Sequence, residues 1–211
     1  MKRLIFISIC LLTIMSLVVG CGASKKVTRI DPEEVTDLSG RWNDTDSRLV
    51  SQEMIMDCLN HPWINEHMTA KAKKPAIIVG SMRNKSSEHI AVATFVNDIE
   101  RAFINSGQVS VVASAGDREQ LRSEKDDQRV FANPETIKQM GKELGAGFMM
   151  TGEVNTIVDQ EGGEKVTFYQ VDLTLTNIET NVKVWLGQKK IKKWLLISPL
   201  VMEEGKRLLI V

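Results

Sequence analysis

The feature that most constrains this chain is its N-terminus, where a basic start is followed by an apolar run and a small residue. Lys2 and Arg3 precede an apolar stretch over residues 4–19, and Gly20 and Cys21 follow it. This is the layout of a secretory signal peptide. The run is shorter than the roughly 20 residues that a membrane-spanning helix needs. We therefore expect residues 1–20 to be removed, so that the fold is built from the rest of the chain.

The segment Val18-Val19-Gly20-Cys21 resembles the bacterial lipobox, whose cysteine thiol is diacylated before the signal is cut away. The resemblance implies a lipid anchor on Cys21, and two or more acyl chains make such anchoring stable. Gly22 follows, where many Gram-negative lipoproteins carry an aspartate that retains them at the inner membrane, so the resemblance favours the outer membrane. The alternatives are an ordinary secretory signal and an uncleaved anchor with an incidental cysteine.

The charge of the chain argues against a nucleic-acid partner, and its cysteine content argues against an intrachain disulfide. Lys2 and Arg3 are among 27 basic side chains, against 27 acidic ones, so the chain without residues 1–20 is close to neutral. Nucleic-acid binding needs a concentrated basic surface, so we expect no nucleic-acid partner. Of the three cysteines, Cys10 is removed with the signal and Cys21 carries lipid, so only Cys58 remains as a thiol and it cannot form an intrachain disulfide. We interpret Cys58 as a small buried hydrophobe.

The rest of the chain divides into three parts. Residues 21–40 are polar without apolar periodicity, and we interpret them as a flexible, lipid-anchored tether. Residues 41–194 have the length of one domain. Residues 195–211 form a C-terminal extension, whose apolar runs could pair as an extra strand, pack on the domain or be disordered.

Helices and strands alternate in the first part of the domain. Helical spacing places Leu49, Met56, Leu59 and Trp63 near one face of a helix, with Asp44, Thr45 or Asp46 as its N-cap and Val50, Ile55 and Cys58 beside that face. Pro62 should break this helix. The elements expected after it are a helix over 63–71, a strand over 75–82, a loop over 83–87, a helix over 90–106, a strand over 109–113, partly helical residues 117–128, and a helix from Asn133 to Leu144.

The last part of the domain has β patterning. Segments 148–158, 166–178 and 182–194 are separated by Gly162-Gly163 and by Thr180-Asn181, both typical of hairpin turns. Apolar and polar residues alternate in the middle segment, which predicts one buried and one wet face. Lys189, Lys190, Lys192 and Lys193 crowd the last segment, as in a solvated edge strand or, alternatively, a partner-binding strip. The predicted fold is α/β, a mixed sheet covered by helices and ending in an antiparallel meander.

No catalytic or metal-binding motif is recognisable in the sequence. His61 and His67 are not spaced to place two ligands on one helical face. Gly141, Gly145 and Gly147 close a predicted helix, whereas a phosphate-binding loop places its glycines before one. Nucleophile motifs such as Gly-x-Ser-x-Gly are missing from the sequence. We therefore predict no catalytic residue, no metal and no cofactor.

Four segments resemble the LpoB family of lipoproteins, which activate class A penicillin-binding proteins. They are residues 40–47 (GRWNDTDS), 84–90 (NKSSEHI), Ser106-Gly107 before a strand, and 145–154 (GAGFMMTGEV), the last of which is also similar to the N-terminal domain of TolB. The resemblance covers about residues 40–194. It implies a TolB-like mixed-sheet domain that docks on a bifunctional peptidoglycan synthase, across the periplasm, and stimulates it without being an enzyme.

Two groups of residues are candidates for contact with this partner. The first lies between tether and domain, where a tryptophan beside an arginine is typical of interface hot spots: Arg41, Trp42 and Asn43. Alternatively, Trp42 packs over the start of the first helix. The second group forms the loop after the first strand, where α/β folds often place contacts: Arg83, Asn84, Lys85, Ser86 and Ser87. The alternative there is helix capping by Ser86 or Ser87.

Two other functions remain compatible with the sequence. One is a general envelope lipoprotein with a TolB-like domain that assists the assembly or transport of surface components. The other is a hydrolase whose catalytic motif is not recognisable.

Overall fold

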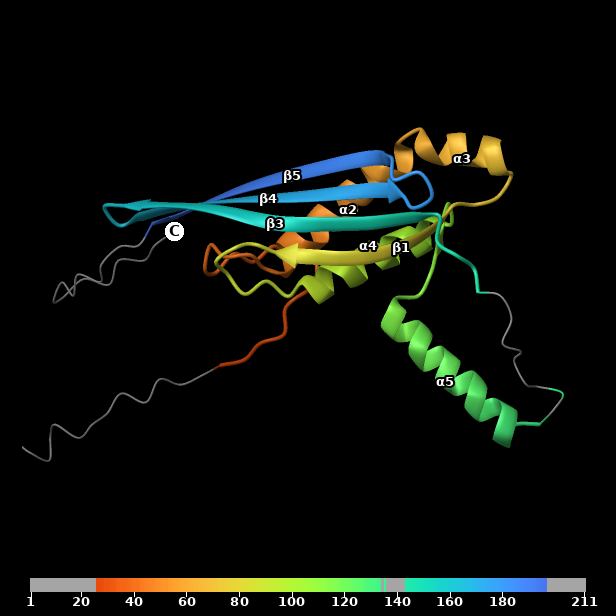
Figure 1. Ribbon diagram of the computed structural model, residues 1–211. Coiled ribbons are helices and arrows are strands. Elements are labelled where there is room, and N and C mark those ends of the chain that lie inside the picture. The colour runs from red at the N-terminus through yellow and green to blue at the C-terminus, as the bar shows by residue number, and fades with distance from the viewer. Residues whose placement is uncertain (1–25, 134, 136–142, 197–211) are drawn as a thin grey trace, which may run out of the picture. The chain divides into compact units, whose positions relative to one another are not determined.

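The computed structural model describes residues 26–133, 135 and 143–196 (Figure 1). Cys21, residues 197–211 and most of the helix predicted from Asn133 to Leu144 lie outside the described residues. The chain divides into two compact units, residues 1–34 and 35–211. In the first unit, the Asp31 carbonyl accepts a hydrogen bond from the backbone N–H of Glu34 at 3.0 Å, which closes a turn.

All helices and strands of the described residues belong to the second unit. In chain order they are α2 (Asp44–Asn60), α3 (Trp63–Lys71), β1 (Ala76–Asn84), α4 (Val92–Ser106), β2 (Ser110–Val111), α5 (Ala115–Phe131), β3 (Phe148–Glu161), β4 (Glu164–Asn177) and β5 (Lys183–Leu196). Within the described ranges, no helix has both the length and the apolar stretch that crossing a bilayer requires.

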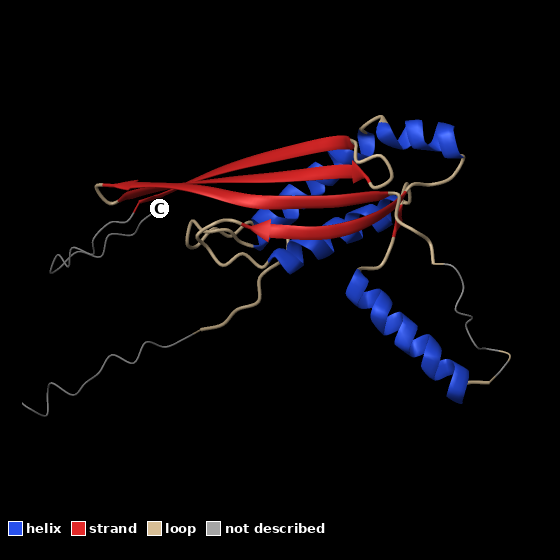
Figure 2. Ribbon diagram, in the orientation of Figure 1, coloured by secondary structure: helices blue, strands red, loops and turns tan. Residues whose placement is uncertain are grey.

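The strands form one mixed sheet in the order β2-β1-β3-β4-β5. β1 runs parallel to β2 and β3, whereas β3, β4 and β5 form an antiparallel meander. Helices α2 and α4 pack together and lie against one face of this sheet (Figure 2). The predicted α/β class, with a helix-covered mixed sheet that ends in a meander, is confirmed.

The alternation in β4 separates a buried face from an open one. Tyr169, Val171, Leu173 and Leu175 are buried, while the residues between them are partly exposed. Val171, Leu173 and Leu175 belong to a core that also contains Val50, Met54 and Ile55 of α2 and Phe95, Ile99 and Phe103 of α4. The helices thus cover one face of the sheet, and we call the other the open face.

The start of α2 differs from the prediction. The N-cap is Asn43, whose Oδ1 accepts from the backbone N–H of Asp46 at 3.0 Å, while the Asp46 carboxylate accepts from the backbone N–H of Asn43 at 3.0 Å. Such a reciprocal capping box satisfies two free helix-end donors, so Asn43 caps better than the three predicted residues.

The predicted buried face of α2 was also wrong in part. Leu49 and Met56 are 48% and 64% exposed, whereas Ser47 and Ser51 are buried in line with Val50, Met54, Ile55 and Cys58. A stripe that includes small serines does not register as apolar periodicity, which explains the error.

The boundaries of three elements also differ from those predicted from the sequence. β1 extends to Asn84 because β3 continues to offer partners, pairing Arg83 with Glu153 and Asn84 with Val154. β2 is reduced to Ser110–Val111. α5 begins at Ala115, two residues earlier than predicted, because Ser114 forms a capping box with Asp117.

The β3–β4 hairpin is long and paired along its whole length, from Phe148 with Asn177 to Glu161 with Glu164. Gly162 and Gly163 have φ angles of 58° and 86°. Two successive positive φ angles match the twist of a tight two-residue hairpin turn, which glycine adopts without strain. The predicted hairpin at Gly162-Gly163 is therefore confirmed.

Candidate functional site

Trp42 fixes the segment that enters the domain before α2. Its indole ring lies edge-on to Phe95 and Tyr169, with ring centroids 6.5 and 5.6 Å away. The indole Nε1 donates a hydrogen bond to Ser47 Oγ at 2.7 Å. Trp42 thus packs over the start of α2, as the alternative interpretation had it, and its contact with a partner stays a prediction.

Glu88 connects the two predicted groups. One carboxylate oxygen, Oε2, accepts from the backbone N–H of Trp42 at 3.1 Å and from the Tyr169 hydroxyl at 2.8 Å. Burial and the hydrogen bond to Glu88 raise the pKa of Tyr169, so the phenol stays a neutral donor. The backbone carbonyl of Glu88 accepts from Asn84 Nδ2 at 2.7 Å. Sequence reasoning missed this residue, because a single glutamate in a polar segment carries no spacing signal.

The segment after β1 folds into a side-chain-stabilised turn. Asn84 Oδ1 accepts from the backbone N–H and the hydroxyl of Ser86, at 2.9 and 2.6 Å. The backbone N–H of Ser87 donates to Thr156 Oγ1 at 3.4 Å. The alternative interpretation, in which Ser86 or Ser87 caps a helix, was wrong, since the N-cap position of α4 is Ala91. The turn forms because an asparagine side chain hydrogen-bonds the backbone two residues on.

Lys193 of β5 anchors the same entry segment from the sheet. Its ammonium lies 2.5 Å from Asp37 Oδ1, 2.6 Å from Asp46 Oδ2 and 3.1 Å from the Arg41 carbonyl oxygen. The side chains of Lys193 and Asp46 are only 10% and 9% exposed. Asn43 Nδ2 also donates to Asp37 Oδ1, at 2.6 Å. Residues 37–46 are therefore held to the domain by a largely buried ion cluster.

Two of the four β5 lysines are therefore not the solvated edge residues that the sequence predicts. Lys189 and Lys193 lie on the helix-covered face, where Lys189 pairs with Glu53 of α2 and Lys193 with the two aspartates. Lys190 and Lys192 are exposed on the open face. β5 is an edge strand of the sheet, in agreement with the prediction.

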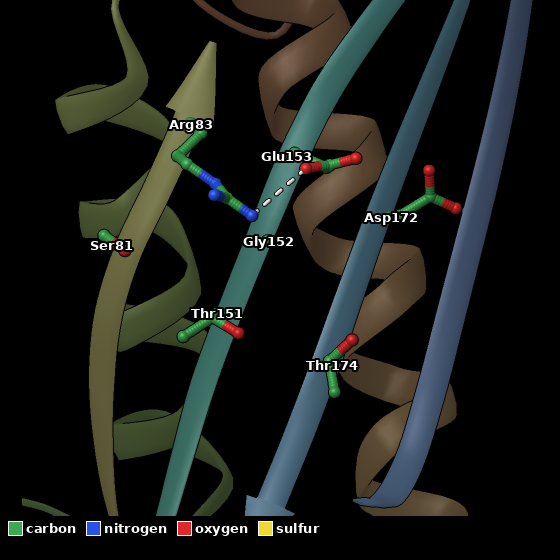
Figure 3. A pocket seen from close by; sticks show the side chains of 7 residues that line it. All are labelled: Ser81, Arg83, Thr151, Gly152, Glu153, Asp172 and Thr174. Carbon is green, nitrogen blue, oxygen red and sulfur yellow. Dashed lines mark hydrogen bonds and ion pairs between the residues drawn. The ribbon is translucent and has the colours of Figure 1, made fainter. Parts of the chain in front are cut away.

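The open face contains a shallow hollow of about 410 Å³ across β1, β3 and β4 (Figure 3). Polar side chains and one glycine line it: Ser81, Arg83, Thr151, Gly152, Glu153, Asp172 and Thr174. Two carboxylates from neighbouring strands, Glu153 and Asp172, are cross-strand partners. The hollow therefore combines hydroxyl groups with charges of both signs.

Each carboxylate in the hollow already has donors from its own chain. Glu153 Oε2 is 2.7 Å from Lys85 Nζ and 3.3 Å from Arg83 Nη2. The hydrogen bond from Lys85 holds the pKa of Glu153 below its usual value, so Glu153 is an ionised acceptor at neutral pH. Asp172 accepts from the side-chain amides of Gln170 and Gln188, both at 2.8 Å.

This chemistry suits contact better than catalysis. A general acid needs a raised pKa, and Glu153 has the reverse. Over the described residues, no three His, Cys, Asp or Glu side chains come together in a group that could hold a metal ion. Cys58 is fully buried, and burial raises the pKa of its thiol to about 12, so it is not an activated nucleophile.

The predicted residues do not form one cluster. Trp42 meets the Asn84–Ser86 turn through Glu88, on the helix-covered side, whereas Asn43 bonds to Asp37 and Asp46. Arg83 and Lys85 share Glu153 on the open face. Arg41 is exposed, and its backbone is held by Lys193 on the helix-covered side. Cys21 lies outside the described residues.

Comparison with known proteins identifies the family. A family model described as the peptidoglycan-synthase activator LpoB matches residues 46–191, from α2 into β5. No protein with a curated description matches the chain in sequence. Activators of this family are non-enzymatic regulators, and their partner is a peptidoglycan synthase of the cell envelope.

Several solved structures are similar at low identity. The LpoB C-terminal domain from Salmonella enterica has 13% identity and a TM-score of 0.40, covering 69% of this chain and 98% of that one. The LpoB C-terminal domain from Escherichia coli has 13% identity and a TM-score of 0.35, with coverages of 67% and 97%. Lipoprotein GNA1162 from Neisseria meningitidis has 13% identity and a TM-score of 0.37, with coverages of 57% and 83%. Because the family model spans well over half of the sequence, the chain belongs to the LpoB family of peptidoglycan-synthase activators.

Proposed function

We propose that this chain is an outer-membrane lipoprotein, anchored through Cys21, that binds and activates a bifunctional class A penicillin-binding protein by protein–protein contact. The family match over residues 46–191 carries the proposal. The donor-saturated carboxylates of the open face and the buried Cys58 thiol support a role in contact. Activation by contact requires a folded surface and no reacting group.

We further propose that the exposed members of the predicted groups touch the synthase and that the half-buried members hold them in place. Arg41, Arg83, Lys85 and Ser87 are exposed. The supporting residues are half-buried and hydrogen-bonded to the domain: Trp42, Asn43, Asn84 and Ser86. Exposed arginines are among the residues that contribute most to protein interfaces.

The direct test is reconstitution of the full lipidated chain, in detergent, with each class A penicillin-binding protein of the same genome. We expect measurable binding and a faster rate of glycan polymerisation by one of these synthases. If none binds and none is accelerated, the proposed activation is wrong. Capture of an outer-membrane assembly complex without any effect on a synthase would instead favour a role in surface assembly or transport.

Charge reversal tests the proposed contact residues. Arg83→Glu and Arg41→Glu should each weaken binding, whereas Arg101→Glu on α4 is the control. Arg83 and Arg101 are matched, since their side chains are 68% and 67% exposed and each contacts one carboxylate. Unchanged affinity in both test variants would rule out these residues as contacts.

The anchor has its own test. Protein extracted from membranes should carry diacylglycerol on Cys21, measured by mass spectrometry of the N-terminal peptide, and should fractionate with the outer membrane. A Cys21→Ser chain should carry no diacylglycerol, keep its signal peptide uncleaved and no longer fractionate with the outer membrane. Mature protein without fatty acid would refute the anchor while leaving the synthase contact open to the binding assay.

A further inference from the structure

The two edges of the sheet differ in how they are protected. β5 forms one edge and carries several lysines, a common way to keep an edge strand from pairing with another chain. At the other edge, β2 covers only the start of β1, where it pairs with Ala76 and Ile77. Over the described residues, the rest of β1 borders the sheet without a neighbouring strand on that side (Figure 1). The stretch from Ile78 to Gly80 carries no charge that would discourage pairing.

Val79 has backbone groups on this uncovered side of β1. The backbone of a strand points to alternate sides from one residue to the next, and the carbonyl of Ile77 accepts from the backbone N–H of Val112 at 2.8 Å, on the β2 side. Val79, two residues on, therefore directs its N–H and carbonyl to the same side. None of the described residues bonds to them there. Val79 is only 5% exposed, and backbone groups so nearly buried are rarely left unpaired, so a partner is missing at this position.

A groove of about 580 Å³ runs along this part of β1, between β1, α4 and the start of α5. We call it the β1 groove. Ile78, Val79 and Val96 make part of its lining apolar, and Glu100 and Asp117 add two carboxylates. A peptide that adds to a sheet edge gains affinity from backbone hydrogen bonds and specificity from the surface that its side chains meet. The β1 groove offers both kinds of contact, so it suits an extended polypeptide.

Glu100 gives the β1 groove a negative charge that its surroundings do not balance. It forms no ion pair and no side-chain hydrogen bond with any described residue, and burial and the nearby Asp117 raise its pKa. Asp117, by contrast, closes the capping box at the start of α5, where the helix dipole favours a negative charge. The arginines next to these acids in sequence are engaged elsewhere, since Arg101 pairs with Asp98 and Arg118 lines a different hollow. A cation beside Glu100 would supply the missing counter-charge.

From these observations we infer that the synthase docks through an extended segment that adds to β1 as a further strand and places a lysine or arginine beside Glu100. The family match supplies the partner, a peptidoglycan synthase. The inference rests on the proposed function and goes beyond it by naming the surface, the mode of contact and the charge of the partner's segment. β1 also leads from the groove to Arg83, one of the proposed contact residues, so a segment that continues along the strand reaches both.

Asn97 gives the steric test, with Asn105 as its matched control. Both are exposed asparagines of α4, and of the two Asn97 lines the β1 groove. With the full chain and a purified class A penicillin-binding protein, Asn97→Trp should obstruct the groove and raise Kd by about tenfold or more. Asn105→Trp should change Kd by less than about threefold. Both variants should melt like the wild type, because the replaced side chains are exposed.

Glu100 tests the charge of the partner's segment. Glu100→Lys should raise Kd by about 30-fold or more, and Glu100→Gln by about tenfold. Glu100→Gln should leave the melting temperature unchanged or raise it, because the carboxylate that it removes is half-buried and has no counter-charge among the described residues. Glu179→Lys, in the exposed turn between β4 and β5, is the control and should leave the affinity unchanged.

Hydrogen exchange tests the addition of a strand. The backbone amide of Val79, resolved by mass spectrometry with electron-transfer fragmentation, should exchange more slowly when the synthase is bound, because the added strand accepts a hydrogen bond from it. The amides of residues 183–188, in β5 at the other edge of the sheet, are the control and should exchange at the same rate with and without the synthase.

Each outcome supports or overturns the inference. If the wild type stimulates the synthase and the Asn97 and Glu100 variants bind it equally well, the β1 groove is wrong and the proposed function stands. If Asn97→Trp and Asn105→Trp weaken binding alike, or the exchange of Val79 does not change, addition to β1 is wrong. If sedimentation shows a wild-type dimer that Asn97→Trp dissociates, the groove holds a second copy of this chain and not the synthase. If the wild type binds no synthase, both proposals fail.

Discussion

Replacing Lys193 by methionine should destabilise the domain far more than the same change at Lys189. Lys193 is 10% exposed and contacts Asp46, which is 9% exposed, and Asp37, which is 49% exposed. Removing one partner of a buried ion pair costs about 3–5 kcal/mol, because the other charge stays buried. Asp46 keeps its hydrogen bond from Asn43 and its place at a helix N-terminus. We therefore expect a loss of about 2–3 kcal/mol in the free energy of unfolding.

The measurement is urea unfolding followed by tryptophan fluorescence. A loss of that size lowers the unfolding midpoint by about 1 M, given a typical urea slope of about 1–3 kcal/mol per M. Lys189→Met is the control, since Lys189 and Glu53 are 32% and 62% exposed and such surface pairs contribute about 1 kcal/mol or less. Equal losses in the two variants would refute the claim that the Lys193 cluster is a buried anchor.

The cluster also predicts how stability depends on pH. The hydrogen bond from Lys193 lowers the pKa of Asp37 below 3.8, so its contribution is present above that pH and is lost as pH falls through the folded-state pKa. Burial lowers the pKa of Lys193, but Asp37 and Asp46 outweigh burial and raise it above 10.5. That contribution is present below pH 10.5 and is lost as pH rises through the folded-state pKa. Lys193→Met should weaken both dependences, and unchanged profiles would argue against the pairing.

Two further predictions concern the buried Cys58 and the half-buried Gly187. Cys58, with a thiol pKa of about 12, should resist iodoacetamide at pH 8 until the protein unfolds; rapid labelling of the Cys58 peptide in the native protein would contradict its burial. A Cβ at Gly187 would lie 2.2 Å from the Trp185 ring, so Gly187→Ala should destabilise by about 1–3 kcal/mol. Gly116→Ala, where nothing lies within 4 Å, should instead be neutral or stabilise by up to about 1 kcal/mol, and equal midpoints for the two variants would disprove the steric argument.

The sequence predicted those parts of the fold that depend on local patterns. Alternation over β4 identified the buried Tyr169, Val171, Leu173 and Leu175, because strand side chains alternate between faces wherever one face is covered. The turn at Gly162-Gly163 was predictable since its geometry demands glycine. The α2 stripe was harder to predict, because buried serines share it with the apolar residues.

The candidate site was less accessible to sequence reasoning, since it depends on residues far apart in the chain. Lys193 meets Asp37 across 156 positions, and Tyr169 meets Glu88 across 81. Four lysines in one strand look equivalent in sequence, yet α2 and the entry segment supply acids to only one side of the sheet.

If Cys21 carries the lipid anchor that we propose, the ion cluster around Lys193 also limits how far the domain can lie from its membrane. Asp37 is bonded to Lys193 of β5 and to Asn43 at the start of α2, so this part of the chain is held against the domain. The segment left to link the lipid to the second unit then runs from Cys21 to Val35. A fully extended polypeptide covers at most 3.3–3.6 Å per residue, so this linking segment is no longer than about 50 Å. With the proposed anchor in the outer membrane, a synthase in the opposite bilayer would have to extend its own binding segment to within that distance of the outer membrane.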